Sequence, residues 1–170
     1  MLHFRFRLSA WLKAFSGIVF SVVLIACQPT QVVQTGLTEA QIAELKAAGF
    51  VASDQGWEFS QSDKVLFASN VATLTAEAKQ TIERVARVLL NIQIARVRVD
   101  GHTDAEGDAN YNQQLSVRRA NSVAEVLVQA GLPAASVSVR GRGKTAPVAS
   151  NQTAAGRAQN RRVAIVVTTE

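Results

Sequence analysis

The feature that most constrains the fold is a hydrophobic period that changes repeatedly along the chain after residue 62. Apolar side chains follow a helical spacing over residues 75–90 and 109–130, which predicts two amphipathic helices. Over residues 95–101 and 136–143, apolar side chains alternate with polar ones, which predicts strands. A chain with this pattern buries its apolar faces by packing helices against a sheet.

Two further segments complete the predicted sheet. We expect residues 64–69 to form its first strand. Residues 161–169 are apolar at most positions and lack a polar face, so we expect them to form a central strand. The prediction is therefore an α/β fold over residues 62–170, a two-layer sandwich in which helices pack on one face of a mixed β-sheet.

The region before this pattern is predicted to consist of a tether followed by a small structured segment. Residues 27–37 are mostly polar and lack a period, as in a tether. Within residues 38–61, a capping-box pattern at Thr38 predicts a short helix. A hairpin follows, with Trp57 and Phe59 on one face. These two aromatic side chains either cover one end of the core or stack against a ligand.

The first 26 residues have the layout of a secretory signal peptide, because basic residues precede an apolar run over residues 18–26. That run is too short to span a bilayer as a mature helix. Residues 24–27 resemble a bacterial lipobox, which implies cleavage before Cys27 and lipidation of its thiol. Gln28 follows the cysteine, and by analogy with lipoproteins this favours the outer membrane. The alternative is an ordinary signal peptide with a chance cysteine.

The composition gives no support to nucleic-acid binding, although the formal net charge is +5. Three of the 18 basic residues lie in the predicted signal peptide, and their removal leaves 15 basic against 13 acidic residues. A domain this close to neutral lacks the basic surface that nucleic-acid binding requires.

Enzymatic and metal functions also lack the necessary residues. His102 is the only histidine after the predicted signal peptide, so no set of zinc ligands is available. Ser116 has no second histidine or lysine arranged as a base, and the glycine-rich residues 141–145 lack the first glycine of a phosphate loop. We therefore predict a protein that is not an enzyme and uses no cofactor or metal.

A group of polar residues around the start of the second predicted helix forms the strongest candidate site. Residues seven apart on a helix differ by about 20° in direction, so Asn112 and Arg119 share a face, with Leu115 between them. Arg119 is in register with the apolar stripe and needs an anionic partner, whereas Arg118 belongs to the solvated side. Asp104 precedes the helix, where the helix dipole favours a carboxylate.

The residues alone leave two interpretations of this group open. Asp104 and Arg119 could form a structural ion pair with each other. They could instead face the opposite charges of one zwitterionic ligand, since a guanidinium binds a carboxylate in bidentate geometry.

The stretch VDGHTDAEGDANYNQQLSVRRANSV, with GRAQNRRV downstream, resembles the OmpA-like C-terminal domain of peptidoglycan-associated lipoproteins. The resemblance implies non-covalent binding of meso-diaminopimelate in peptidoglycan stem peptides. It implies that Asp104 receives the ligand ammonium, that Arg119 receives its carboxylate, and that Asn112 adds a hydrogen bond. The remaining implied site residues line the pocket or lie beside it: Thr103, Leu115, Asn70 and, from the NRR triplet, Arg162.

Residues 37–67 also resemble the amino-terminal region of the YfiB family of outer-membrane lipoproteins. This implies that the region captures a YfiR-like periplasmic repressor and so releases an inner-membrane diguanylate cyclase. The implied partner surface lies on the helix and the hairpin and includes Ile42, Leu45, Phe50, Trp57 and Glu58. The alternative is that the helix merely folds back on the domain.

Two functions are thus predicted for a lipid-anchored outer-membrane protein whose domain faces the periplasm. As a signalling adaptor, it would couple peptidoglycan binding to repressor capture by a shift in conformational population. As a structural anchor, it would only hold the outer membrane to the cell wall.

Overall fold

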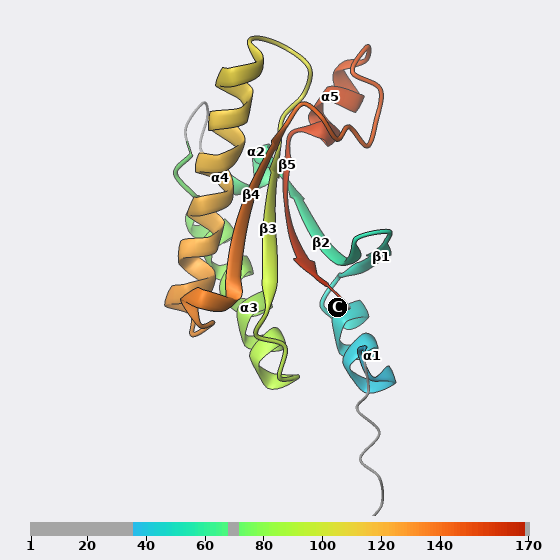
Figure 1. Ribbon diagram of the computed structural model, residues 1–170, viewed down its shortest axis with the longest axis vertical. Helices are drawn as coiled ribbons and strands as arrows, with labels where there is room; N and C mark the ends of the chain where they lie inside the picture. The colour runs from blue at the N-terminus through green and yellow to red at the C-terminus, as the bar shows by residue number, and fades with distance from the viewer. Residues whose placement is uncertain (1–35, 68–71, 169–170) are drawn as a thin grey trace, which may run out of the picture. The chain divides into compact units, whose positions relative to one another are not determined.

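The structure is a computed structural model that describes residues 36–67 and 72–168 (Figure 1). The predictions for the signal peptide, for lipidation of Cys27 and for Asn70 lie outside the described residues. The described part forms a two-layer α/β fold in which a mixed sheet carries helices on one face. The predicted fold class is therefore confirmed.

Five strands form one sheet in the order β1-β2-β5-β3-β4. β3 and β4 run parallel, and each of the other neighbouring pairs is antiparallel. The central strand is β5, as its apolar sequence predicts, and all of its residues are buried. The strand bounds are β1 Val51–Ser53, β2 Gly56–Ser62, β3 Val97–His102, β4 Val137–Gly143 and β5 Arg162–Val167.

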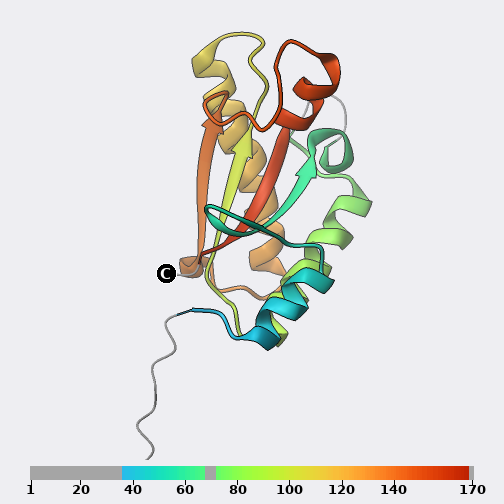
Figure 2. The same cartoon turned by 90° about the vertical axis from the view of Figure 1, so that its right-hand side faces the viewer.

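The two long helices, α3 and α4, cover one face of the sheet (Figure 2). Thr75 caps the start of α3 through a bond from the backbone N–H of Ala78, and Asp108 caps α4 through a bond from that of Tyr111. Three short helices complete the fold, of which α2 and α5 were not predicted. The helix bounds are α1 Glu39–Ala47, α2 Asp63–Leu66, α3 Ala76–Asn91, α4 Ala109–Gln129 and α5 Ala154–Asn160, with a 3-10 turn at Ala134–Ser136.

The prediction of a strand over residues 64–69 was wrong. Residues 63–66 form the helical turn α2 instead, and this turn directs Leu66 and Phe67 into the core. The place beside β5 is taken by β2, from Trp57 opposite Val167 to Ser62 opposite Arg162. β2, which was predicted to belong to a hairpin outside the sheet, is thus one of the strands of the sheet.

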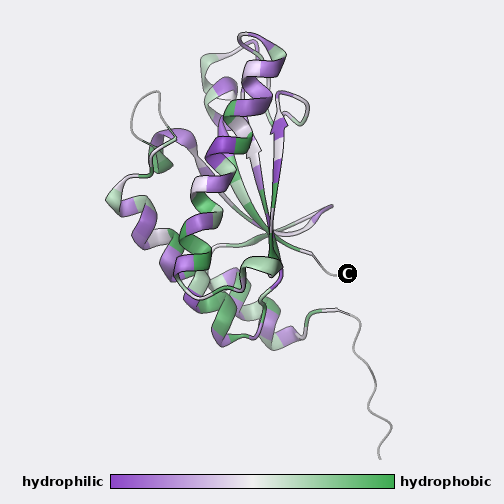
Figure 3. Ribbon diagram, turned by 60° about the vertical axis from the view of Figure 1, so that its left-hand side comes forward, coloured by the Kyte–Doolittle hydropathy of each residue, from purple (hydrophilic) through white to green (hydrophobic). Residues whose placement is uncertain are grey.

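The two ends of the sheet differ in polarity (Figure 3). Hydrophobic residues gather at the lower end, where α1, α3 and the lower part of α4 meet the strands. Hydrophilic residues prevail at the upper end, where β3 ends and α4 and β5 begin. The candidate site lies at this upper end.

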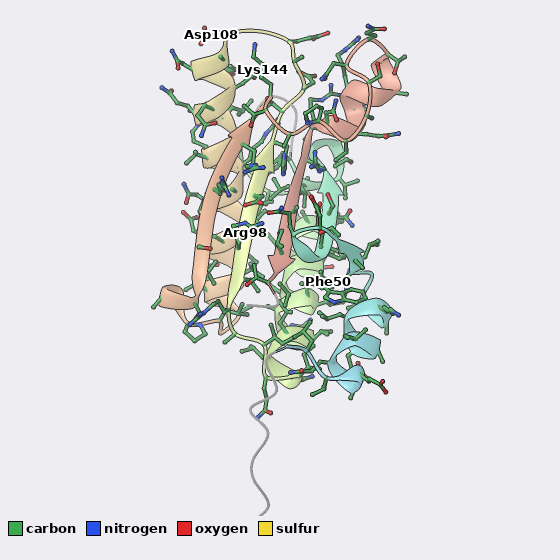
Figure 4. All side chains as sticks on the ribbon, turned by 45° about the vertical axis from the view of Figure 1, so that its right-hand side comes forward. Phe50, Arg98, Asp108 and Lys144 are labelled. Carbon is green, nitrogen blue, oxygen red and sulfur yellow. The ribbon has the colours of Figure 1, made fainter. Side chains whose placement is uncertain are left out.

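α1 folds back on the lower end of the domain. Its capping box is confirmed, because the Thr38 hydroxyl accepts from Gln41 N–H while the Gln41 side chain accepts from Thr38 N–H. Leu45 is fully buried, and the ring centroids of Phe50 (labelled in Figure 4) and Phe59 are 5.5 Å apart. Of the predicted partner residues, Leu45 and Phe50 thus belong to the core in this conformation, whereas Ile42, Trp57 and Glu58 are half-buried.

Within residues 36–67 and 72–168, no helix combines the length and the apolar character that a membrane crossing requires.

Candidate ligand-binding site

The loop that follows β3 is held in place by hydrogen bonds from its own residues and from β4. Thr103 N–H donates to Gly143 C=O at 2.9 Å, and the Thr103 hydroxyl donates to Asp104 C=O at 2.9 Å. Asn112 on α4 donates its side-chain amide to Glu106 C=O at 2.7 Å. Thr103, Asp104 and Asn112 are all buried at the upper end of the sheet, where these bonds fix their positions.

Close packing between β3 and α4 positions the helix against the sheet. A Cβ atom at Gly101 would collide with the carbonyl oxygen of Ser116, so only glycine permits this approach. The Ser116 hydroxyl also accepts from Gly143 N–H at 3.0 Å and donates to Gln113 C=O at 2.7 Å. Ser116 is therefore engaged in holding α4 against the ends of β3 and β4.

Four charged side chains meet at the end of this packed region, and we call them the paired cluster: Asp63, Asp104, Arg119 and Arg161. Arg161 Nη1 donates to Asp104 Oδ2 at 2.7 Å, and Arg161 Nε donates to Asp63 Oδ2 at 3.2 Å. Arg119 Nη2 lies 3.5 Å from Asp63 Oδ2. Asp104 Oδ1 also accepts from Glu106 N–H at 3.1 Å.

The two arginines of the paired cluster have opposite electrostatic environments. Burial lowers the pKa of Arg119, an effect that the carboxylate of Asp63 partly offsets. The hydrogen bond to Asp104 raises the pKa of Arg161. The guanidinium of Arg119 also lies 5.2 Å from the ring centroid of Phe67, a cation–π contact. Two positive and two negative charges thus compensate each other at the upper end of the sheet.

Hydrogen-bonding capacity nevertheless remains unused in the paired cluster. Arg119 Nε and Asp63 Oδ1 are buried and have no hydrogen-bond partner among the described residues. Buried polar atoms are normally paired in native proteins, so these two atoms are free to form a hydrogen bond with a ligand or with water.

The structure brings together Thr103, Asp104, Asn112 and Arg119, with Leu115 half-buried on α4. Asp104 and Arg119 bond to different partners, so the interpretation of a direct ion pair between them does not describe this structure.

The choice of Arg162 as a site neighbour requires a correction. Arg161 lies beside Asp104, whereas Arg162 points to the opposite face of the sheet, 3.9 Å from Glu58. The reason is strand alternation: Val163 and Ile165 on β5 join the core under the helices, so Arg161 shares their side and Arg162 does not.

Sequence reasoning missed Asp63, Arg161 and Tyr111 at this site. The alternation along β5 could have identified Arg161. Asp63 gave no usable signal, because its contact with Arg161 joins residues 98 positions apart. Tyr111 is exposed in the first turn of α4, the helix that carries Asn112 and Arg119.

Comparison with known proteins agrees with this architecture. The family model described as the OmpA family matches residues 66–161. The chain is 52% identical over 154 residues to the outer-membrane lipoprotein YfiB of Pseudomonas aeruginosa. The alignment covers 89% of this chain and 91% of that protein.

Two solved structures share the fold. The cell wall anchor of the T6SS from Pseudomonas aeruginosa has a TM-score of 0.65 and 33% identity, and the match covers 81% of this chain and 100% of that one. The peptidoglycan-associated lipoprotein from Burkholderia pseudomallei has a TM-score of 0.54 and 28% identity. That match covers 60% of this chain and 86% of the other. Asp104, Arg119 and Arg161 of the paired cluster lie inside the segment matched by the family model, and the chain belongs to the OmpA family.

Proposed function

We propose that this protein binds peptidoglycan non-covalently through the zwitterionic end of meso-diaminopimelate, which the paired cluster accommodates. The observation that carries this proposal is the separate pairing of Asp104 with Arg161 and of Arg119 with Asp63. Two similar proteins support it by name, the peptidoglycan-associated lipoprotein and the cell wall anchor.

The mechanism is an exchange of partners. The ligand ammonium takes the place of Arg161 at Asp104, and the ligand carboxylate takes the place of Asp63 at Arg119. Arg161 and Asp63 retain their own bond of 3.2 Å. Every buried charge stays compensated, which matters because an unpaired buried charge costs several kcal/mol.

The neutral residues of the site complete the fit. Arg119 Nε, which has no partner among the described residues, gains a carboxylate oxygen in bidentate geometry. Asn112 and Thr103 keep the loop rigid through their bonds to Glu106 and Asp104, so little ordering is required on binding. Tyr111 and Leu115 offer surface to the aliphatic part of the ligand.

The test is co-sedimentation of the protein with purified peptidoglycan. Asp104→Ala and Arg119→Ala are each expected to weaken binding at least about tenfold, because each removes a charge-assisted contact. Arg118→Ala, exposed on the same helix, is the matched control and should bind as the wild type does. Circular dichroism should show all three variants folded.

A competition experiment identifies the ligand group. Free meso-diaminopimelate should release the protein from peptidoglycan. A lysine blocked at its α-amino and carboxyl groups, which carries an ammonium but no carboxylate, should not. Release by both compounds, or undiminished sedimentation of Asp104→Ala and Arg119→Ala, would show that the paired cluster is not the binding site.

We also propose the location and a second role. By its similarity to an outer-membrane lipoprotein, the protein is anchored in the outer membrane through Cys27, with its domain in the periplasm. That similarity covers 89% of the chain and therefore includes α1 and the hairpin, outside the segment matched by the family model. This favours the role of a signalling adaptor that captures a YfiR-like periplasmic repressor of a diguanylate cyclase.

The adaptor role requires α1 to leave the core, because Leu45 and Phe50 are buried. Leu45→Ala should release α1 and increase co-purification with the repressor, while Glu44→Ala, exposed on the same helix, should change nothing. If neither the wild type nor Leu45→Ala retains the repressor, the protein is a structural anchor alone.

A further inference from the structure

A second group of charged residues lies on the face of the sheet that α3 and α4 leave open. We call it the open-face cluster: Glu58, His102, Arg142 and Arg162. Alternation along β5 turns Arg162 to this face, as described above. An irregularity in the β3–β4 pairing, where His102 is paired with Gly143, brings Arg142 to the same face. Arg98, labelled in Figure 4, belongs to the neighbouring part of this face.

The open-face cluster borders a cavity of about 190 Å³. The floor is formed by strand residues that include Ala164, and residues 146–148 form one wall. This space is distinct from the paired cluster, none of whose residues lines it. Its volume suits a small group of a few heavy atoms with accompanying water.

Three buried polar atoms of the cluster have no hydrogen-bond partner in the described part of the chain. They are His102 Nδ1, Arg142 Nε and Arg162 Nη1. Arg162 is only 9% exposed and His102 only 5% exposed, so these polar groups are largely removed from bulk solvent. Three unsatisfied groups around one cavity require an explanation, since buried donors are normally paired.

The buried and half-buried charges around the cavity are not balanced. Asp100 is engaged by Arg98, whose Nε lies 2.9 and 3.0 Å from its two carboxylate oxygens. Glu58 Oε1 lies 3.9 Å from Arg162 Nε, too far for a hydrogen bond. Asp54 also borders the cavity, but it is exposed in the turn between β1 and β2 and forms no ion pair with Arg142 or Arg162 in the described part of the chain. Among the buried and half-buried groups, two guanidinium groups therefore face one loosely placed carboxylate, an excess of one positive charge.

The electrostatic environment of the ionisable groups agrees with this count. Burial and the neighbouring Arg142 lower the pKa of Arg162, although Glu58 opposes them. Burial and the same two arginines lower the pKa of His102 to about 3, so this side chain is neutral at physiological pH. An added negative charge would stabilise both arginines.

We propose that the open-face cavity binds a carboxylate group. A carboxylate carries the single negative charge that the excess requires, and its two oxygens match the planar donors of Arg142 and Arg162. A neutral His102 supplies one further hydrogen bond. The site is independent of peptidoglycan binding, because it uses other residues on the other face of the sheet.

The experiment is titration of the full-length protein, followed by NMR of the His102 imidazole and by calorimetry. One arm uses acetate, a free carboxylate, and another uses an N-acetylated dipeptide with a free carboxyl terminus. Phosphate is the third arm. Acetate or the peptide should perturb the imidazole signals, and the tighter of the two identifies the source of the carboxylate.

Matched variants assign the binding to the cavity. Arg142→Gln and Arg162→Gln should each weaken carboxylate binding at least about tenfold, because each removes a charge-assisted hydrogen bond. Arg140→Gln, exposed two positions earlier on β4 and outside the cavity, should bind as the wild type does. Asp104→Ala should also leave carboxylate binding unchanged, which separates this proposal from peptidoglycan binding.

Three results would overturn the proposal. The first is no perturbation by either carboxylate, and the second is equal binding by Arg142→Gln and the wild type. The third is tighter binding of phosphate than of both carboxylates, which would assign the cavity to another class of anion.

Discussion

Arg161 and Arg162 are neighbours in the sequence, yet they belong to two charge clusters with opposite properties. Arg161 bonds to two carboxylates in the paired cluster, and its pKa is raised. Arg162 has one distant carboxylate in the open-face cluster, and its pKa is lowered. One peptide unit thus separates a compensated charge from an uncompensated one.

The difference teaches that burial alone does not decide how a charged residue is used. Arg119 and Arg162 are similarly buried, and burial lowers the pKa of both. They differ in the groups around them, because the paired cluster holds as many carboxylates as guanidinium groups. The first cluster can exchange partners with a zwitterion, whereas the second can only gain an anion.

The largest expected loss of stability comes from Asp63→Asn in the paired cluster. This change leaves Arg119 and Arg161 to share Asp104 and should lower the free energy of unfolding by about 3 kcal/mol, as for a broken buried ion pair. Urea unfolding followed by circular dichroism measures the change.

The matched control for Asp63→Asn is Glu58→Gln in the open-face cluster. The distance of 3.9 Å between Glu58 and Arg162 predicts a loss below about 1 kcal/mol. Equal losses in the two variants would remove the distinction between the clusters.

A smaller effect should appear in the pH dependence of stability. The pKa of His102 is about 3 in the folded protein and 6.5 in the unfolded chain, so the unfolded chain binds a proton first as the pH falls. Stability should therefore decrease below pH 6.5, with a slope that approaches about 1.4 kcal/mol per pH unit.

Urea unfolding between pH 7.5 and 5 measures this slope, at values where most carboxylates remain charged. His102→Gln should remove most of it. An unchanged slope in His102→Gln would contradict the assignment to this imidazole.

The smallest expected effect is that of Arg118→Ala. Arg118 is exposed on α4 beside the buried Arg119, so its removal should change the free energy of unfolding by less than about 0.5 kcal/mol. Thermal unfolding measures the change. A loss comparable to that of Asp63→Asn would mean that Arg118, and not Arg119, belongs to the paired cluster.

The predictions that succeeded depended on local periodicity. The ranges predicted for α3, α4, β3, β4 and β5 match the structure within one or two residues, because each segment repeats its own pattern over a full element. The capping box at Thr38 was recognisable for the same reason. The α2 turn was not, since four residues are too few to show a period.

The site was predicted only where it depended on one element. The spacing of seven residues placed Asn112 and Arg119 on one helical face, and both are buried as expected. Asp63 was not predicted, because its contact with Arg161 joins distant segments and such a contact leaves no local sequence pattern.

The sequence by itself determined the order of helices and strands, the central place of β5 and the buried face of α4, because side-chain periodicity follows from backbone geometry. Only the tertiary structure decided which carboxylate pairs with which arginine, since those partners come from four separate segments. Charge pairing depends on distances of a few ångströms between elements, and a linear pattern carries no such distances.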